Sequence, residues 1–124
     1  MQRPYIAAIR LGFVAALAFT LYRALLTADG VNFIPWDKAR HFIAFYALTV
    51  LAAAGWPRTR PVLIGAALSA FGVLIELLQA LPVINRDADV WDWVADSLAI
   101  AAALGPMLLA PLRRWAAESP GERR

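Results

Sequence analysis

Long apolar stretches separated by short polar connections dominate the chain. They cover about residues 6–26, 39–56, 61–82 and 91–112, with few charged residues inside them. A membrane-spanning helix needs about 20 residues, and only a helix satisfies its own backbone hydrogen bonds inside lipid. The pattern therefore predicts an all-α integral membrane protein, in which residues 1–124 form one domain, a four-helix bundle with short connections.

The first stretch also fits a second interpretation. Arg3 and Arg10, followed by the apolar segment Leu11–Phe19, resemble the charged and apolar regions of a secretory signal peptide. The apolar stretch nevertheless continues past Arg23 as far as Leu26. That length favours a first helix that is retained in the membrane.

Composition supports the membrane interpretation and excludes several other classes of protein. Of 124 residues, 61% are hydrophobic and 17% charged, whereas a soluble domain averages about 45–50% apolar residues. The absence of cysteine excludes disulfide scaffolds and thiol nucleophiles. The formal net charge is +3, but the arginines do not form one stripe, so we expect no nucleic-acid partner.

Basic residues are divided unevenly between the two predicted sides of the membrane. Eight lie on one side, namely Arg3, Arg10, Arg58, Arg60, Arg113, Arg114, Arg123 and Arg124. Four lie on the other, namely Arg23, Lys38, Arg40 and Arg86. The positive-inside rule predicts a protein of the bacterial cytoplasmic membrane with both termini in the cytoplasm.

Residues at the predicted helix ends fit this layout. Asp37 precedes the second stretch and Asp89 the fourth, where a carboxylate can cap free amide groups. Asp92, three residues after Asp89, resembles the second partner of a capping box. Tryptophans at both predicted interfaces fit two aromatic belts. They are Trp56 and Trp115 on the cytoplasmic side, and Trp36, Trp91 and Trp93 on the outer side.

Charged and polar residues gather in the predicted outer half of the bundle. They are Asp37, Lys38, Arg40, His41, Glu76, Gln79, Arg86, Asp87, Asp89, Asp92 and Asp96. A carboxylate deep in a membrane costs a few kcal/mol and is expected to face the bundle interior. Because acids outnumber bases in this group, some carboxylates must be protonated, bind a cation or meet water.

The chemistry of these side chains suggests three kinds of role. His41 and Glu76 are candidate catalytic acid–base residues. Asp92 and Asp96 are candidate ligands of a divalent cation such as Mg²⁺, Ca²⁺, Mn²⁺ or Zn²⁺. The candidate binding residues are Asp37, Lys38, Arg40, Gln79, Arg86 and Asp89. Structural alternatives exist for some of them, since Asp37 and Asp89 can be caps and His41 a hydrogen-bonded interfacial residue.

Three motifs resemble those of the VanZ-like family of small bacterial membrane proteins. They are D-K-x-x-H-F-x-x-F-Y from Asp37, I-E-x-x-Q from Ile75, and R-x-x-D-x-x-D-x-x-x-D from Arg86. The resemblance covers about residues 35–105 and departs from the family at Asp96 and Ala99, where the family often has Asn and Gly. It implies a role at the cell envelope, since the founding member is associated with teicoplanin resistance.

Two functions from different classes remain open. The first is a binding protein whose acid-rich outer pocket handles lipid head groups or lipid-linked cell-wall precursors. The second is a membrane-embedded, metal-assisted enzyme that acts on a phospholipid or lipid-linked substrate. Ion or proton passage through Glu76 and Asp96 would need a polar track into the inner half, which the sequence does not show.

Overall fold

The fold is known from a computed structural model that describes residues 4–26, 37–84 and 88–117, with only the backbone for residue 37 and residues 112–117. The described residues form four helices and no strand. The helices are α1 (Pro4–Leu26), α2 (Asp37–Gly55), α3 (Pro61–Gln79) and α4 (Val90–Ala117). The predicted all-α class and the number of helices are confirmed.

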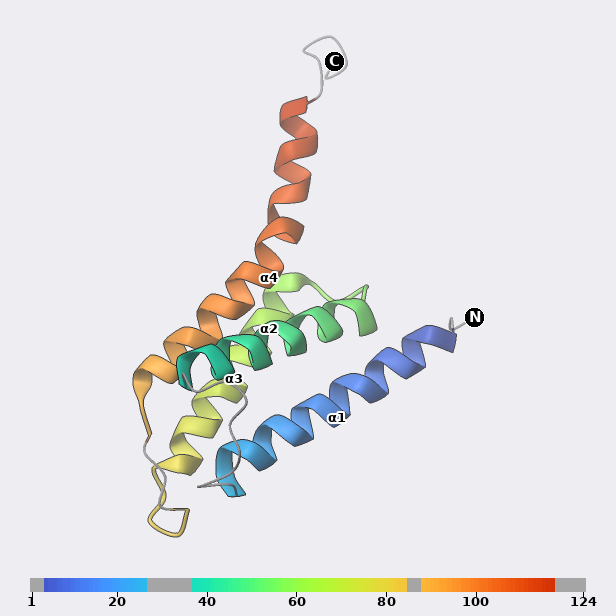
Figure 1. Cartoon of the computed structure of the whole chain (residues 1–124). Helices are drawn as coiled ribbons and strands as arrows, with labels where there is room; N and C mark the ends of the chain where they lie inside the picture. The colour runs from blue at the N-terminus through green and yellow to red at the C-terminus, as the bar shows by residue number, and fades with distance from the viewer. Residues whose placement is uncertain (1–3, 27–36, 85–87, 118–124) are drawn as a thin grey trace.

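α2 lies at the centre of the bundle and contacts each of the other three helices (Figure 1). α3 packs against both α1 and α4 as well, whereas α1 is the peripheral helix. Arg10 near the start of α1 contacts Gly55 at the end of α2, so these helices run antiparallel. The N-terminal ends of α2 and α4 lie together, and the C-terminal end of α3 joins them.

The buried apolar core comes from α2, α3 and α4. Its residues are Phe45, Leu48, Ala52, Ile64, Leu68, Ile75, Ala99, Ile100 and Leu104. α1 contributes no buried residue, but Phe13, Leu17 and Leu21 pack against this core from one side. A core this small leaves most apolar side chains on the outside of the bundle.

The outer surface of the bundle is apolar on every helix. Leu11 on α1, Leu77 on α3 and Leu98 on α4 are each at least 60% exposed. By length and composition, α1, α3 and the Val90–Pro111 part of α4 could each cross a membrane. A bundle that exposes its large hydrophobic side chains to this extent is a membrane protein, since so large an apolar surface is unfavourable in water.

The prediction of four spans is shown for only three helices. α2 has 19 residues, a spanning length, but three of its first four residues, Asp37, Lys38 and Arg40, are charged. These charges lower its apolar character below that of the other three helices.

Two helix ends differ from their predicted positions. α3 ends at Gln79 instead of residue 82, because Pro82 has no amide hydrogen and disfavours helical geometry at Leu81. α4 continues to Ala117, beyond the predicted residue 112, with Pro106 and Pro111 inside it. Proline bends a helix without necessarily ending it, and α4 changes direction before its C-terminal part leaves the bundle (Figure 1).

Candidate functional site

Among the described residues, six ionisable side chains meet where α2 and α4 begin and α3 ends, one of them just before the first turn of α4. We call them the polar cluster, and they are Lys38, His41, Glu76, Asp89, Asp92 and Asp96. Their spacing explains the meeting, since residues three or four apart lie on one helix face. Lys38 and His41 share a face of α2, and Asp92 and Asp96 share a face of α4.

Lys38 bridges two carboxylates of the polar cluster. Its Nζ lies 2.6 Å from Asp89 Oδ2 and 2.7 Å from Asp92 Oδ1. Lys38 precedes the apolar part of α2, and the hydrogen bonds with Asp89 and then Asp92 raise the pKa of its ammonium group above the ordinary value. The lysine is therefore charged, and it ties the start of α2 to the start of α4.

His41 lies between the two carboxylates of α4, Asp92 and Asp96. Its Nδ1 is 2.9 Å from Asp96 Oδ1, and its Nε2 is 3.6 Å from Asp92 Oδ2. With Asp96 ionised, Nδ1 is the donor, because an ionised carboxylate can only accept hydrogen bonds. Asp96 is fully buried and Asp92 is 3% exposed. The histidine ring is thereby held in a fixed orientation, with Nε2 directed toward Asp92.

Glu76 connects α3 to the start of α4. Its Oε2 accepts a hydrogen bond of 2.8 Å from the backbone amide of Asp89. Asp89 in turn caps α4, because its Oδ1 accepts a hydrogen bond from the amide of Trp91. The predicted cap at Asp89 is confirmed. The predicted capping-box role of Asp92 is wrong, since Glu76 binds the Asp89 amide and Asp92 binds Lys38.

The second oxygen of Glu76 has a different environment. Oε1 is buried and has no hydrogen-bond partner among the described residues. A buried carboxylate oxygen without a partner carries a substantial desolvation penalty. Glu76 therefore has one carboxylate oxygen whose hydrogen bonding is incomplete among the described residues.

Gly72 gives Asp96 its place between α3 and α4. A Cβ atom at residue 72 would lie 2.9 Å from Asp96 Oδ2 and 3.3 Å from Trp93 Cδ1. The absence of a side chain thus lets the carboxylate approach the α3 backbone. The sequence explains Gly72 only as a position of close helix packing, although its distance of four residues from Glu76 places both on one face.

Other predicted site residues are placed elsewhere or are not described. Gln79 is 4% exposed, and its Nε2 donates to the backbone oxygen of Ala24 on α1, so it anchors α1. Arg40 is half-buried on α2. The side chain of Asp37 and the whole of Arg86 lie outside the described residues.

Trp93 has a role that the sequence did not indicate. Its indole Nε1 donates to the oxygens of Ser69, at 3.1 Å for Oγ and 3.3 Å for the backbone. Ser69 Oγ also lies 3.3 Å from Ser97 Oγ. Trp93 therefore packs against α3, three residues from Asp96.

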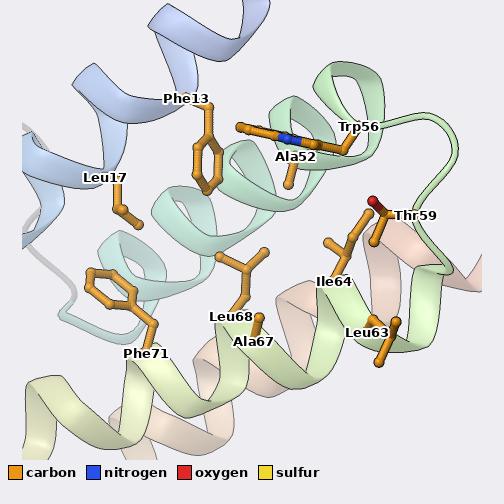
Figure 2. A pocket seen from close by; sticks show the side chains of 10 residues that line it. All are labelled: Phe13, Leu17, Ala52, Trp56, Thr59, Leu63, Ile64, Ala67, Leu68 and Phe71. Atoms are coloured by element: carbon orange, nitrogen blue, oxygen red, sulfur yellow. The ribbon is translucent and has the colours of Figure 1, made fainter.

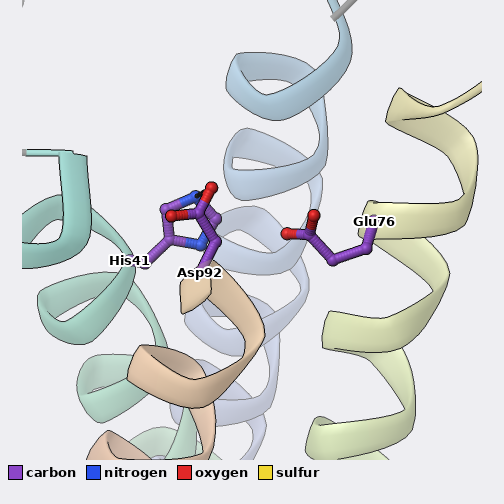
Figure 3. Close-up of side chains that lie close together, drawn as sticks. All are labelled: His41, Glu76 and Asp92. Atoms are coloured by element: carbon purple, nitrogen blue, oxygen red, sulfur yellow. Dashed lines mark ion pairs between the residues drawn. The ribbon is translucent and has the colours of Figure 1, made fainter. Parts of the chain in front are cut away.

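Three members of the polar cluster are arranged as metal ligands could be. His41, Glu76 and Asp92 each offer one ligand atom, and these atoms lie within 4.8 Å of one another. Figure 3 shows the carboxylate of Glu76 extending from α3 toward His41 and Asp92. The sequence predicted Asp92 and Asp96 as the metal ligands, whereas the geometry groups Asp92 with His41 and Glu76 and places Asp96 on the far side of the imidazole.

The opposite end of α2 has an apolar character. A cavity of about 370 Å³ opens between α1, α2 and α3, and its lining residues carry no ionisable group (Figure 2). Beside it, Arg10 donates through Nε to the backbone oxygen of Gly55 at 2.8 Å and lies over the ring of Trp56. Phe13 packs edge-on against the same ring. These contacts hold α1 to the end of α2.

Comparison of the chain with protein-family models, curated proteins and solved structures finds no match.

Proposed function

We propose that the chain is a VanZ-like protein of the bacterial cell envelope that binds the polar head group of a membrane lipid or lipid-linked cell-wall precursor. The carrying observation is the polar cluster, in which six of the described ionisable side chains, from α2, α3, α4 and the residue before α4, gather at one end of the bundle. Ionisable residues within membrane helices generally mark a functional site.

The position of the polar cluster suits a ligand that lies in the membrane. It occupies the end of the bundle where α2 and α4 begin, so a head group at the membrane surface can reach it while the acyl chains remain in lipid. Lys38 offers a cation to a phosphate, and the carboxylates offer acceptors to an amine. A phosphate would also meet Glu76 and Asp92, which repel it unless a cation lies between them.

Mass spectrometry of co-purifying lipids tests this proposal. We expect one lipid class to be enriched with the wild-type protein and lost from Lys38→Gln and Glu76→Gln. The control Arg10→Gln removes a cation from the opposite end of α2 and should keep the lipid. The mass separates a phospholipid from a lipid-linked precursor. Identical lipid profiles in all four proteins would contradict the proposal.

A metal-assisted enzyme acting on a phospholipid or lipid-linked substrate is the second candidate. It is favoured by the grouping of His41, Glu76 and Asp92, whose ligand atoms could hold a metal ion that activates water. Purified protein in phospholipid vesicles with Mn²⁺ should then release a water-soluble head group, and His41→Gln should abolish the release. A protein that binds lipid without releasing product is a binding protein only.

We also propose that all four helices cross the membrane, with both termini in the cytoplasm. The support is the excess of arginine on the predicted inner side. Because the chain has no cysteine, single cysteines introduced at the exposed positions Thr59 and Val83 can be labelled selectively. In intact cells without an outer-membrane barrier, an impermeant maleimide should label Val83→Cys and not Thr59→Cys.

The same experiment distinguishes three spans from four. With the N-terminus inside and α2 not crossing, residue 59 would lie outside and residue 83 inside, so the labelling pattern would be reversed. The two alternatives therefore predict opposite results for the same pair of variants.

A further inference from the structure

We propose that the polar cluster binds one divalent cation of the Mn²⁺ or Zn²⁺ type through His41 Nε2, Glu76 Oε1 and a carboxylate oxygen of Asp92, with Asp96 as a positioning residue. The ion's role toward a head group rests on the proposed function, whereas the ion site itself rests on the geometry of these four side chains. The ion would let an acid-rich site attract an anionic phosphate.

The orientation of His41 is the first argument for the ion. Nδ1 donates to Asp96, and this leaves the lone pair of Nε2 directed toward Asp92 Oδ2 at 3.6 Å. This distance is too long for a good hydrogen bond between the two atoms. Two ligands about 2.1 Å from one tetrahedrally coordinated ion lie about 3.4 Å apart, close to the observed distance.

The Asp96–His41 hydrogen bond is itself typical of metal sites. A histidine ligand usually donates its other ring N–H to a carboxylate or carbonyl group, which fixes the tautomer and makes the ligating nitrogen more basic. Asp96 meets this description, since it is fully buried and lies 2.9 Å from Nδ1. Its place is fixed in turn by the close approach to Gly72.

Glu76 provides the second, independent argument. Its Oε2 is held by the amide of Asp89, and its Oε1 is buried with no hydrogen-bond partner among the described residues. The carboxylate extends toward His41 and Asp92 (Figure 3). Coordination of a cation would compensate for the desolvation of Oε1.

The ligand set indicates the class of ion. Carboxylate oxygens suit Mg²⁺, Ca²⁺ and Mn²⁺, whereas imidazole suits Zn²⁺ and other transition metals. One imidazole and two carboxylates therefore favour an ion that accepts both kinds of ligand, so Mn²⁺ and Zn²⁺ should bind more tightly than Mg²⁺ or Ca²⁺. The ligand atoms lie within 4.8 Å of one another, so the most widely separated pair would draw together by up to about 1.4 Å around a tetrahedrally coordinated ion.

Mn²⁺ binding to the full chain in lipid-free detergent tests the ligand set. Electron paramagnetic resonance of free Mn²⁺ should show one ion bound per chain. Loss of a residue that only supports a metal ligand usually weakens metal binding by about 10- to 100-fold. Because His41 and Glu76 are proposed as ligands themselves, His41→Gln and Glu76→Gln should each weaken Mn²⁺ binding by at least that factor. The control Asp89→Asn removes one charge next to the proposed ligands and retains a helix cap. It should weaken binding less than about 5-fold, the effect of a partly exposed charge.

The role of Asp96 needs a spectroscopic measurement. In Asp96→Asn, Co²⁺ should bind about 10- to 100-fold more weakly, and its visible absorption bands should shift because the imidazole is a poorer donor. The Arg10→Gln control, at the opposite end of α2, should leave the bands unchanged. A purely structural role of Asp96 predicts lower thermal stability with an unchanged Co²⁺ spectrum, which would overturn its assignment as a positioning residue.

Other results would overturn the site as a whole. They are the absence of Mn²⁺ binding to folded wild-type protein, and an equal loss of affinity in Glu76→Gln and Asp89→Asn, which would indicate general charge attraction. The two proposals also fail separately. Lipid enrichment without Mn²⁺ binding contradicts the ion site alone, and Mn²⁺ binding without lipid enrichment contradicts the proposed function alone.

Discussion

The two ends of α2 each have a basic side chain in contact with a neighbouring helix, yet the contacts differ in kind. At the C-terminal end, Arg10 donates to the backbone oxygen of Gly55 and covers the ring of Trp56. At the N-terminal end, Lys38 binds Asp89 and Asp92, and His41 lies between Asp92 and Asp96. In the part of the chain that the structure describes, four carboxylates, counting Glu76, meet one lysine and one histidine there.

The difference separates a structural contact from a site. The last carbonyl groups of a helix have no donor within the helix, and one arginine can supply a hydrogen bond to such a group. This contact does not create a group of like charges inside the bundle. A group of buried carboxylates is expensive to maintain and adds little to stability over apolar packing. A bound ligand would therefore account for the carboxylates at the polar end, whereas helix packing accounts for the contacts at the other end.

The largest expected effect comes from removing the buried carboxylate of the polar end. Asp96→Ala should lower the free energy of unfolding by about 3–5 kcal/mol, because His41 loses its buried partner. Asp96→Asn should cost less, since its amide oxygen can still accept the hydrogen bond from Nδ1. Denaturation in mixed detergent micelles measures both. If Asp96→Ala lowers the free energy of unfolding by no more than Arg10→Gln does, the proposed difference between the two ends is wrong.

The approach of α3 to α4 next to the polar cluster gives the second prediction. Gly72→Ala should destabilise the protein by about 1–3 kcal/mol, because the new Cβ would lie 2.9 Å from Asp96 Oδ2. Gly12→Ala on α1 is the matched control, since nothing lies within 4 Å of its Cβ position, and it should be neutral or stabilising by up to about 1 kcal/mol. Equal thermal stability of the two variants would show that Asp96 can shift away from residue 72 without loss of stability.

The smallest effect is expected at the apolar end. Arg10→Gln should lower stability by about 1–2 kcal/mol, through loss of the hydrogen bond to Gly55 and of the contact with the Trp56 ring. Thermal denaturation in detergent measures the loss. Lipid enrichment and Mn²⁺ affinity should be the same as in the wild type. A change in either would mean that the two ends of α2 are coupled.

The sequence by itself determined the helices and where the ionisable residues collect. Apolar runs of spanning length and the requirement to satisfy backbone hydrogen bonds in lipid leave only helices, and the bounds agree within a few residues except at the prolines of α3 and α4. Placing Glu76, Asp92 and His41 at one end of the bundle needed only their positions along successive antiparallel helices.

Only the tertiary structure decided which atoms meet. Periodicity along one helix is a local property, whereas the rotation and closeness of neighbouring helices follow from packing between them. Gly72 lets Asp96 reach the α3 backbone, so that Asp96 binds His41 Nδ1. Gln79, one turn from Glu76, binds α1 instead of the polar cluster. The same sequence spacing would permit other pairings, and the contacts across α2, α3 and α4 select one of them.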